Sequence, residues 1–192
     1  MNLPNKLTFS RILMIPIFIL LLSIPFPWGA WDIGNSELPV AHFLAALIFI
    51  IAAATDWIDG YYARKYQLVT NLGKFMDPLA DKLLVSAALI LLVEMEIAPA
   101  WIVIIIISRE LAVTGLRLVA AGEGIVLAAG SMGKLKTATQ MISIAVLLLH
   151  NFPFSYIDFP FGIIMLYIAL IFTIISGVDY FIKNWHVMRD SK

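Results

Sequence analysis

Four aspartates lie between positions 56 and 81 at spacings that place them in pairs on helical faces. Asp56 and Asp59 are three residues apart, and Asp77 and Asp81 are four apart. On an α-helix these separations correspond to about 60° and about 40° of rotation, so the two carboxylates of each pair share a face. If the two helices are antiparallel neighbours joined by a short loop, all four carboxylates converge.

Four carboxylates so close together repel one another unless cations lie between them. Hard oxygen ligands suit Mg²⁺, Mn²⁺ or Ca²⁺, and the chain has no cysteine that would favour a softer metal. The sequence therefore predicts a divalent-metal site. The alternative is that these aspartates form ordinary ion pairs with the basic side chains that surround them, which are Arg64, Lys65, Lys74 and Lys82.

Basic residues form a second group that could bind an anion. Arg109 follows a run of isoleucines, which is deep in an apolar stretch for a cation, and Arg117 lies about 80° further around the same helix. Glu110 projects about 100° from Arg109, so their pairing is not assured. We predict a basic pocket for an acceptor phosphate, formed by Thr8, Arg11, Arg109, Arg117, Lys134 and Lys136. The alternative is that the cations only set membrane topology.

Other polar residues in the apolar stretches have simpler interpretations. Asp179 is expected to cap a helix or form an ion pair. Contacts between helices are expected for Thr137, Thr139, Gln140 and Ser143.

The composition indicates the elements that must position these groups. The 192 residues are 61% hydrophobic and 14% charged, with a mean hydropathy of +0.94, whereas soluble domains carry about 25% charged residues. We therefore predict an all-α integral membrane protein of one domain, residues 1–192. Its six transmembrane helices are expected at 7–25, 38–63, 77–93, 98–121, 134–151 and 161–182.

The thirteen Lys and Arg residues predict the orientation of these spans. They lie near the termini and around the second-to-third and fourth-to-fifth connections, and the connections 27–37, 94–97 and 152–160 have none. The positive-inside rule then places both termini and the four aspartates at the cytoplasmic side. The formal net charge of zero argues against a nucleic-acid partner. Because no Arg- and Ser-rich transit segment is seen, we expect a bacterial plasma membrane.

Residues 56–81 resemble the signature of the CDP-alcohol phosphotransferase family, D-x2-D-G-x2-A-R-x8-G-x3-D-x3-D. All eight fixed positions are present: Asp56, Asp59, Gly60, Ala63, Arg64, Gly73, Asp77 and Asp81. Weaker similarity extends to the bacterial phosphatidylglycerophosphate synthases of this family, in N-L-P-N-K-L-T-F-S-R-I at 2–12, S-R-E-L at 108–111, T-G-L-R at 114–117 and G-K-L-K-T at 133–137.

The resemblance implies a fold of six spans and a homodimeric enzyme that transfers the phosphatidyl group of CDP-diacylglycerol to sn-glycerol 3-phosphate, releasing CMP. It implies that Asp56, Asp59 and Asp77 bind metal, with Mg²⁺ or Mn²⁺ as the cofactor and two ions expected. It implies that Asp81 is the general base and also contacts metal. The CDP moiety would contact Asp56, Gly60, Ala63, Arg64 and Gly73.

Several alternatives remain open at the level of sequence. Inositol phosphate would use the same cations as glycerol phosphate, and serine is a less obvious acceptor. Attack could be direct or could pass through a phospho-aspartyl intermediate. A cation-binding transporter is a remote alternative, because no inverted repeat is visible. An intramembrane prenyltransferase would have its two Asp motifs further apart in a longer chain, and a purely structural membrane protein would have no use for the four aspartates.

Overall fold

The computed structural model describes residues 3–34, 36–65, 71–122, 124–125, 127, 130–185 and 189. Among these, the side chains of residues 3–7, 56–65, 71–78 and 131 lie outside the description. The six expected helices are present: α1 (Leu3–Ser23), α2 (Val40–Lys65), α3 (Asn71–Glu94), α4 (Ala100–Gly122), α5 (Ser131–Leu148) and α6 (Phe161–Lys183).

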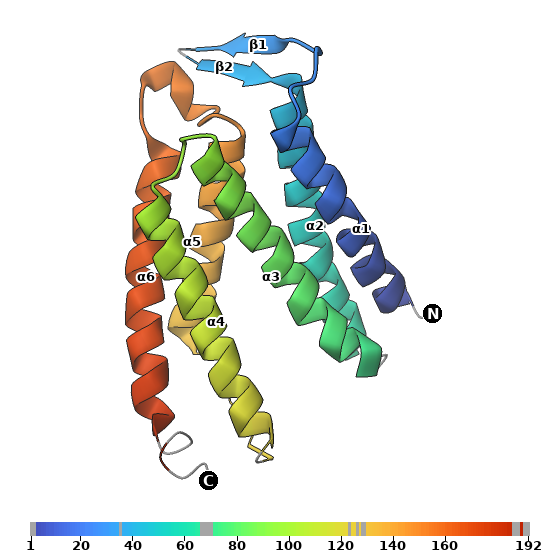
Figure 1. Cartoon of the computed structure of the whole chain (residues 1–192), viewed down its shortest axis with the longest axis vertical. Helices are drawn as coiled ribbons and strands as arrows, with labels where there is room; N and C mark the ends of the chain where they lie inside the picture. The colour runs from blue at the N-terminus through green and yellow to red at the C-terminus, as the bar shows by residue number, and fades with distance from the viewer. Residues whose placement is uncertain are drawn as a thin grey trace.

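The helices form an elongated bundle in which all of them run roughly along one long axis (Figure 1). α1 packs on α2 and α3, and α6 packs on α4 and α5. One end of the bundle, which we call the basic end, holds the start of α1 and the end of α6 (Figure 1). The end of α2, the start of α3, the end of α4 and the start of α5 also lie toward this end. This arrangement agrees with the expected order of spans.

Apolar side chains cover both the inside and the outside of the bundle. The core includes Phe18, Phe49, Leu89 and Ile102, which are essentially inaccessible. Large apolar side chains also point outward and stay exposed; examples are Leu13, Ile104, Leu118 and Ile182. An outer surface of this kind is unusual for a protein in water and normal for one in lipid, where exposed apolar groups carry no penalty.

A short β-hairpin departs from the all-α expectation. Strands β1 (Ala30–Ile33) and β2 (Ser36–Pro39) form an antiparallel hairpin at the end opposite the basic end (Figure 1). Gly34 has a φ of +62° there, and an added Cβ would lie 2.9 Å from the backbone of Ser155, so this turn requires glycine. Hydropathy alone did not reveal the hairpin, because its strands are only four residues long.

The helix boundaries differ from the expected spans by several residues. α3 begins at Asn71, six residues before the predicted span, and α5 ends at Leu148, three residues early. Hydropathy locates only the apolar stretch that can lie in the hydrocarbon core of a membrane. The helix itself can continue into polar sequence, because its backbone hydrogen bonds do not depend on side-chain polarity. Three residues after the end of α5, Asn151 adopts a φ of 65°, and its side chain donates to Phe159 O and accepts from Gly162 N across the loop.

Of the described helices, α6 is the one that passes a test of length and hydropathy for a full membrane crossing. Shorter apolar stretches occur at Thr8–Ser23 and Val40–Thr55. Six crossings therefore remain a prediction.

Candidate active site

The aspartate motif lies on α2 and α3 near the basic end of the bundle. Asp56 and Asp59 are in the last turns of α2, and Asp77 and Asp81 are in the first half of α3. Helical backbone at both pairs supports the predicted sharing of faces, and α2 and α3 contact each other. The side chains of Asp56, Asp59 and Asp77 lie outside the described residues, as do those of Gly60, Ala63, Arg64 and Gly73.

Among the described side chains, no three His, Asp or Glu residues form a metal-binding group. The motif as a whole still fits a divalent metal by its chemistry. Its four acidic residues offer only hard oxygen donors, and helical spacing puts them in pairs on two helices that pack together.

Asp81 is the motif carboxylate whose side chain is described, and it borders two adjoining cavities. The larger cavity, of about 250 Å³, is surrounded by α3, α4, α5 and α6, and we call it the basic pocket. The smaller cavity, of about 60 Å³, is surrounded by α3, α4 and α5, and we call it the inner chamber. Both cavities are lined by Asp81, Lys82, Glu110, Lys136 and Thr137.

A network of ion pairs forms one wall of the basic pocket. Glu110 Oε1 accepts hydrogen bonds from Lys136 Nζ at 2.6 Å and from Arg109 Nη1 at 2.9 Å. Arg109 Nη2 donates to Ser176 Oγ on α6 at 3.0 Å. The network thus joins α4, α5 and α6 and holds two cations beside the cavity.

A second set of contacts holds the other cations of the basic pocket. Arg117 Nε donates to the Tyr180 hydroxyl at 3.0 Å, and the guanidinium lies 5.4 Å from the centre of the Tyr180 ring. Lys82 Nζ donates to Thr114 Oγ1, whose hydroxyl in turn bonds the Glu110 carbonyl at 2.6 Å. Asp179 pairs with Lys183 at 2.8 Å, as expected for an ion pair.

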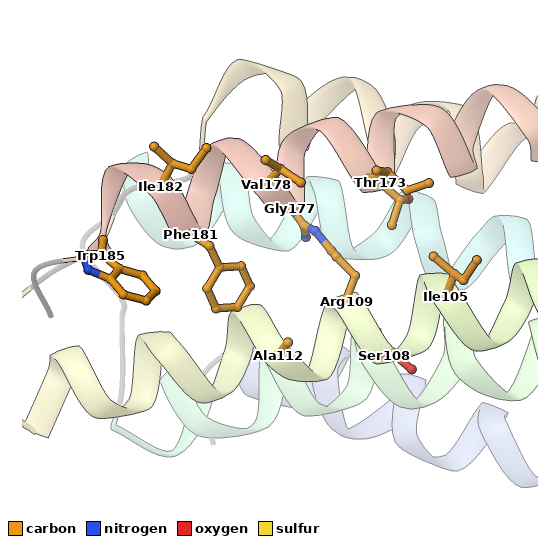
Figure 2. A pocket seen from close by; sticks show the side chains of 11 residues that line it. Ile105, Ser108, Arg109, Ala112, Thr173, Gly177, Val178, Phe181, Ile182 and Trp185 are labelled. Carbon is orange, nitrogen blue, oxygen red and sulfur yellow. The ribbon is translucent and has the colours of Figure 1, made fainter. Parts of the chain in front are cut away.

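An apolar groove runs between α4 and α6 beside the basic pocket (Figure 2). Its walls carry Ile105, Thr173, Phe181 and Trp185, and Arg109 lines both the groove and the basic pocket. Figure 2 shows the Arg109 side chain extending from α4 toward Gly177 on α6. An added Cβ at Gly177 would lie 3.1 Å from Arg109 Cγ, so the small residue makes room for the arginine.

Three of the six predicted acceptor residues border the basic pocket: Arg109, Arg117 and Lys136. The other three are not among its described lining residues. Lys134 is exposed on α5. Thr8 and Arg11 are almost fully buried in α1, which packs on α2 and α3, on the far side of the bundle from α6. The structure therefore brings three of the predicted residues together around one cavity, and the role of the other three stays a prediction.

Several residues of the site were not singled out from sequence as part of it. In the sequence, Glu110 is recognisable only as a neighbour of Arg109, and Ser176 and Tyr180 carry no signal beyond their place in α6. Of the four residues expected to join helices, Ser143 does so by donating to Gly162 O at 2.8 Å, whereas Thr137 and Thr139 bond their own helix. Gln140 is buried, and neither of its amide atoms has a hydrogen-bond partner among the described residues.

The arrangement combines a carboxylate, a group of fixed cations and an apolar exterior. Guanidinium and ammonium groups around a cavity favour a small anion, and phosphate suits the forked donors of arginine. A carboxylate at the edge of the same cavity can accept a proton from a bound hydroxyl. The site can therefore bind a phosphorylated alcohol and activate it.

Comparison with known proteins agrees with the family that the aspartate motif indicates. A model of the CDP-alcohol phosphatidyltransferase family matches residues 1–175. The chain is 59% identical over 190 residues to the CDP-diacylglycerol–glycerol-3-phosphate 3-phosphatidyltransferase of Bacillus subtilis. This alignment covers 99% of this chain and 98% of the relative. Enzymes of the same name from Rickettsia typhi and Haemophilus influenzae are 41% and 40% identical, over 94% and 93% of this chain and 95% and 91% of their own lengths.

The family match extends over most of the chain and includes the whole aspartate motif, and the relatives align with this chain nearly end to end. The sequence resemblance is thereby confirmed: the chain belongs to the CDP-alcohol phosphatidyltransferase family.

Proposed function

We propose that this protein transfers the phosphatidyl group of CDP-diacylglycerol to sn-glycerol 3-phosphate, giving phosphatidylglycerophosphate and CMP. The observation that carries the proposal is the juxtaposition of Asp81 with three of the four described cations around one cavity, Arg109, Arg117 and Lys136. The relatives named for this reaction, aligned over nearly their whole lengths, support the choice of donor and acceptor.

The metal requirement follows from the family, whose members use divalent metal ions. Asp56, Asp59, Asp77 and Asp81 are the residues that would hold them, and two ions of Mg²⁺ or Mn²⁺ suit four carboxylates. Divalent metal held by these carboxylates would supply neutralisation of the negative charge on the donor pyrophosphate and on CMP. Asp56, Gly60, Ala63, Arg64 and Gly73 would contact the CDP moiety, because they share the motif and small residues let a flat base approach a helix.

The proposed step is a direct displacement. The acceptor's 1-hydroxyl oxygen forms a bond to the phosphorus that carries diacylglycerol, and the bond from that phosphorus to the oxygen bridging to CMP breaks. The bridging oxygen leaves with the electron pair as part of CMP. The proton of the attacking hydroxyl passes to the Asp81 carboxylate, which borders the cavity.

Arg109, Arg117 and Lys136, which border the basic pocket, would bind the acceptor phosphate, and Thr8, Arg11 and Lys134 remain proposed members of the same set. Fixed hydrogen bonds to Glu110, Ser176 and Tyr180 hold the cations in place before the acceptor arrives. Such preorganisation reduces the ordering that binding would otherwise require.

The membrane setting completes the proposal. The chain crosses a bacterial plasma membrane six times as one domain, with both termini and the aspartates at the cytoplasmic side, and it acts as a homodimer. A donor with two acyl chains then stays in the bilayer while its headgroup reaches the basic end of the bundle. The exposed apolar side chains on the outside of the helices support this setting.

The test is an assay with purified protein in mixed micelles of detergent and CDP-diacylglycerol, with Mg²⁺ or Mn²⁺. Labelled glycerol 3-phosphate, inositol phosphate and serine are supplied in parallel. We expect CMP release that requires the metal and glycerol 3-phosphate. CMP release with only inositol phosphate or only serine would show that this compound, and not glycerol 3-phosphate, is the acceptor. No CMP release with any of the three would refute the proposal.

A further inference from the structure

Gln140 is a buried polar side chain whose amide lacks partners. It lies on α5 with 2% of its surface accessible, and neither Oε1 nor Nε2 has a hydrogen-bond partner among the described residues. Buried amides are nearly always hydrogen-bonded, because an unsatisfied one loses its contacts with water and gains nothing in return. Both halves of the amide therefore remain available to a ligand.

The amide lines the inner chamber, which continues the basic pocket one helical turn deeper into the bundle. On α5, the basic pocket is lined from Met132 to Thr137 and the inner chamber from Lys136 to Met141. On α3 the lining likewise extends from Asp81 and Lys82 to Val85 and Ser86. The two cavities are thus stacked, with Asp81 and Lys136 at their junction.

This stacking matches the shape of a short phosphorylated polyol. Its phosphate would lie among the cations of the basic pocket, and its reacting hydroxyl would lie beside Asp81 at the junction. The remaining hydroxyl, on the carbon between those that bear the phosphate and the reacting hydroxyl, would branch sideways into the inner chamber. A hydroxyl both donates and accepts, and a glutamine amide has one group for each role, whereas the Lys and Arg side chains of the basic pocket only donate.

We propose that Gln140 determines specificity by hydrogen-bonding the hydroxyl of the acceptor that does not react, an inference that rests on the proposed function. The chamber volume of about 60 Å³ suits a single hydroxymethylene group and is too small for the ring of an inositol. The inner chamber therefore selects acceptors that carry a second hydroxyl, and the basic pocket selects acceptors that carry a phosphate.

The experiment compares two acceptors that differ in one hydroxyl: sn-glycerol 3-phosphate, and 3-hydroxypropyl phosphate, which keeps the phosphate and the reacting hydroxyl. The wild type is expected to prefer glycerol 3-phosphate by about 10-fold or more in kcat/KM, since sites built around a substrate hydroxyl reject the analogue without it. In Gln140→Leu this preference should fall to about 3-fold or less, through poorer use of glycerol 3-phosphate alone.

A matched control is Thr139→Val, because among the described residues the Thr139 hydroxyl donates to carbonyls of its own helix, those of Leu135 and Lys136. This variant should keep the wild-type preference. Gln140→Met, whose side chain is similar in length, is made in parallel in case leucine packs poorly.

Each outcome has a separate meaning. A wild-type preference in an active Gln140→Leu or Gln140→Met protein would overturn the inference and leave the proposed function intact. Equal loss with both acceptors in both variants would assign Gln140 to packing and also overturn it. No CMP from the wild type with glycerol 3-phosphate would refute the proposed function itself, and this inference with it.

Discussion

Lys136 Nζ on α5 lies 2.6 Å from Glu110 Oε1 on α4, and the lysine side chain is 5% exposed. The same carboxylate oxygen also accepts a hydrogen bond from Arg109 at 2.9 Å. Taking an ammonium and a guanidinium out of water is costly unless an anion lies close by. Glu110 is therefore the counter-ion that allows two cations to border the basic pocket.

Removing the charge of Glu110 should destabilise the fold. In Glu110→Gln the two cations lose their anion, and we expect a loss of about 1–3 kcal/mol in the free energy of unfolding. Lys136→Gln should also destabilise the protein. The double variant should lose less than the sum of the two, because the partners interact directly. Denaturant unfolding in detergent measures this coupling, and strictly additive effects would show that the pair contributes no stability.

The hydroxyl of Tyr180 should matter for the acceptor. Tyr180→Phe keeps the ring beneath the Arg117 guanidinium and removes the hydrogen bond of 3.0 Å that orients it. We expect the KM for glycerol 3-phosphate to rise about 3- to 10-fold with little change in the KM for CDP-diacylglycerol. Tyr167→Phe is the control, since that ring lies near Trp101 toward the opposite end of α6. Equal effects of the two changes would argue against a role for Arg117.

Gly177 should be sensitive to any larger side chain. In Gly177→Val the new atoms meet Arg109, whose Cγ would be 3.1 Å from the Cβ, and push the guanidinium away from Ser176. We expect the KM for glycerol 3-phosphate to rise about 10-fold or more, as for other losses of a charged hydrogen bond. Gly115→Val is the control, because a Cβ there meets no described atom within 4 Å. A normal KM in Gly177→Val would show that Arg109 does not bind the acceptor.

The four motif aspartates should each be needed for activity. Asp56→Asn, Asp59→Asn, Asp77→Asn and Asp81→Asn keep side-chain size and remove the charge that binds metal or accepts the proton. We expect kcat to fall about 100-fold or more in each, the usual scale for losing a general base or a metal ligand. Asp32→Asn, in the hairpin at the other end of the bundle, is the control. Wild-type CMP release in any one motif variant would remove that residue from the site.

The orientation of the chain can be tested because it has no cysteine, so any introduced one is unique. Asp32→Cys in the hairpin and Lys183→Cys at the end of α6 both place the thiol at an exposed position, at opposite ends of the bundle. A membrane-impermeant maleimide should label Asp32→Cys in intact cells and Lys183→Cys only after permeabilisation. The reverse pattern would invert the proposed topology.

The amino-acid sequence by itself determined the features that depend on local order along the chain. Six apolar stretches predicted six helices, because a span must satisfy its backbone hydrogen bonds internally. The spacing of the aspartates predicted pairs on helical faces, and the motif predicted the family. The hairpin and the true ends of α3 and α5 were not predicted. Hydropathy identifies stretches apolar enough for the hydrocarbon core of a membrane, and it does not report where backbone hydrogen bonds begin or end.

Only the tertiary structure decided which polar side chains meet. Lys134 and Lys136 are two residues apart, yet Lys134 is exposed while Lys136 is buried against Glu110, because a rotation of about 200° places them on opposite faces of α5. Arg11 lies on α1, which packs on α2 and α3, whereas Arg109, Arg117 and Lys136 border a cavity between α3, α4, α5 and α6. Which face of a helix meets which neighbour depends on the packing of the whole bundle, and spacing within one segment does not contain that information.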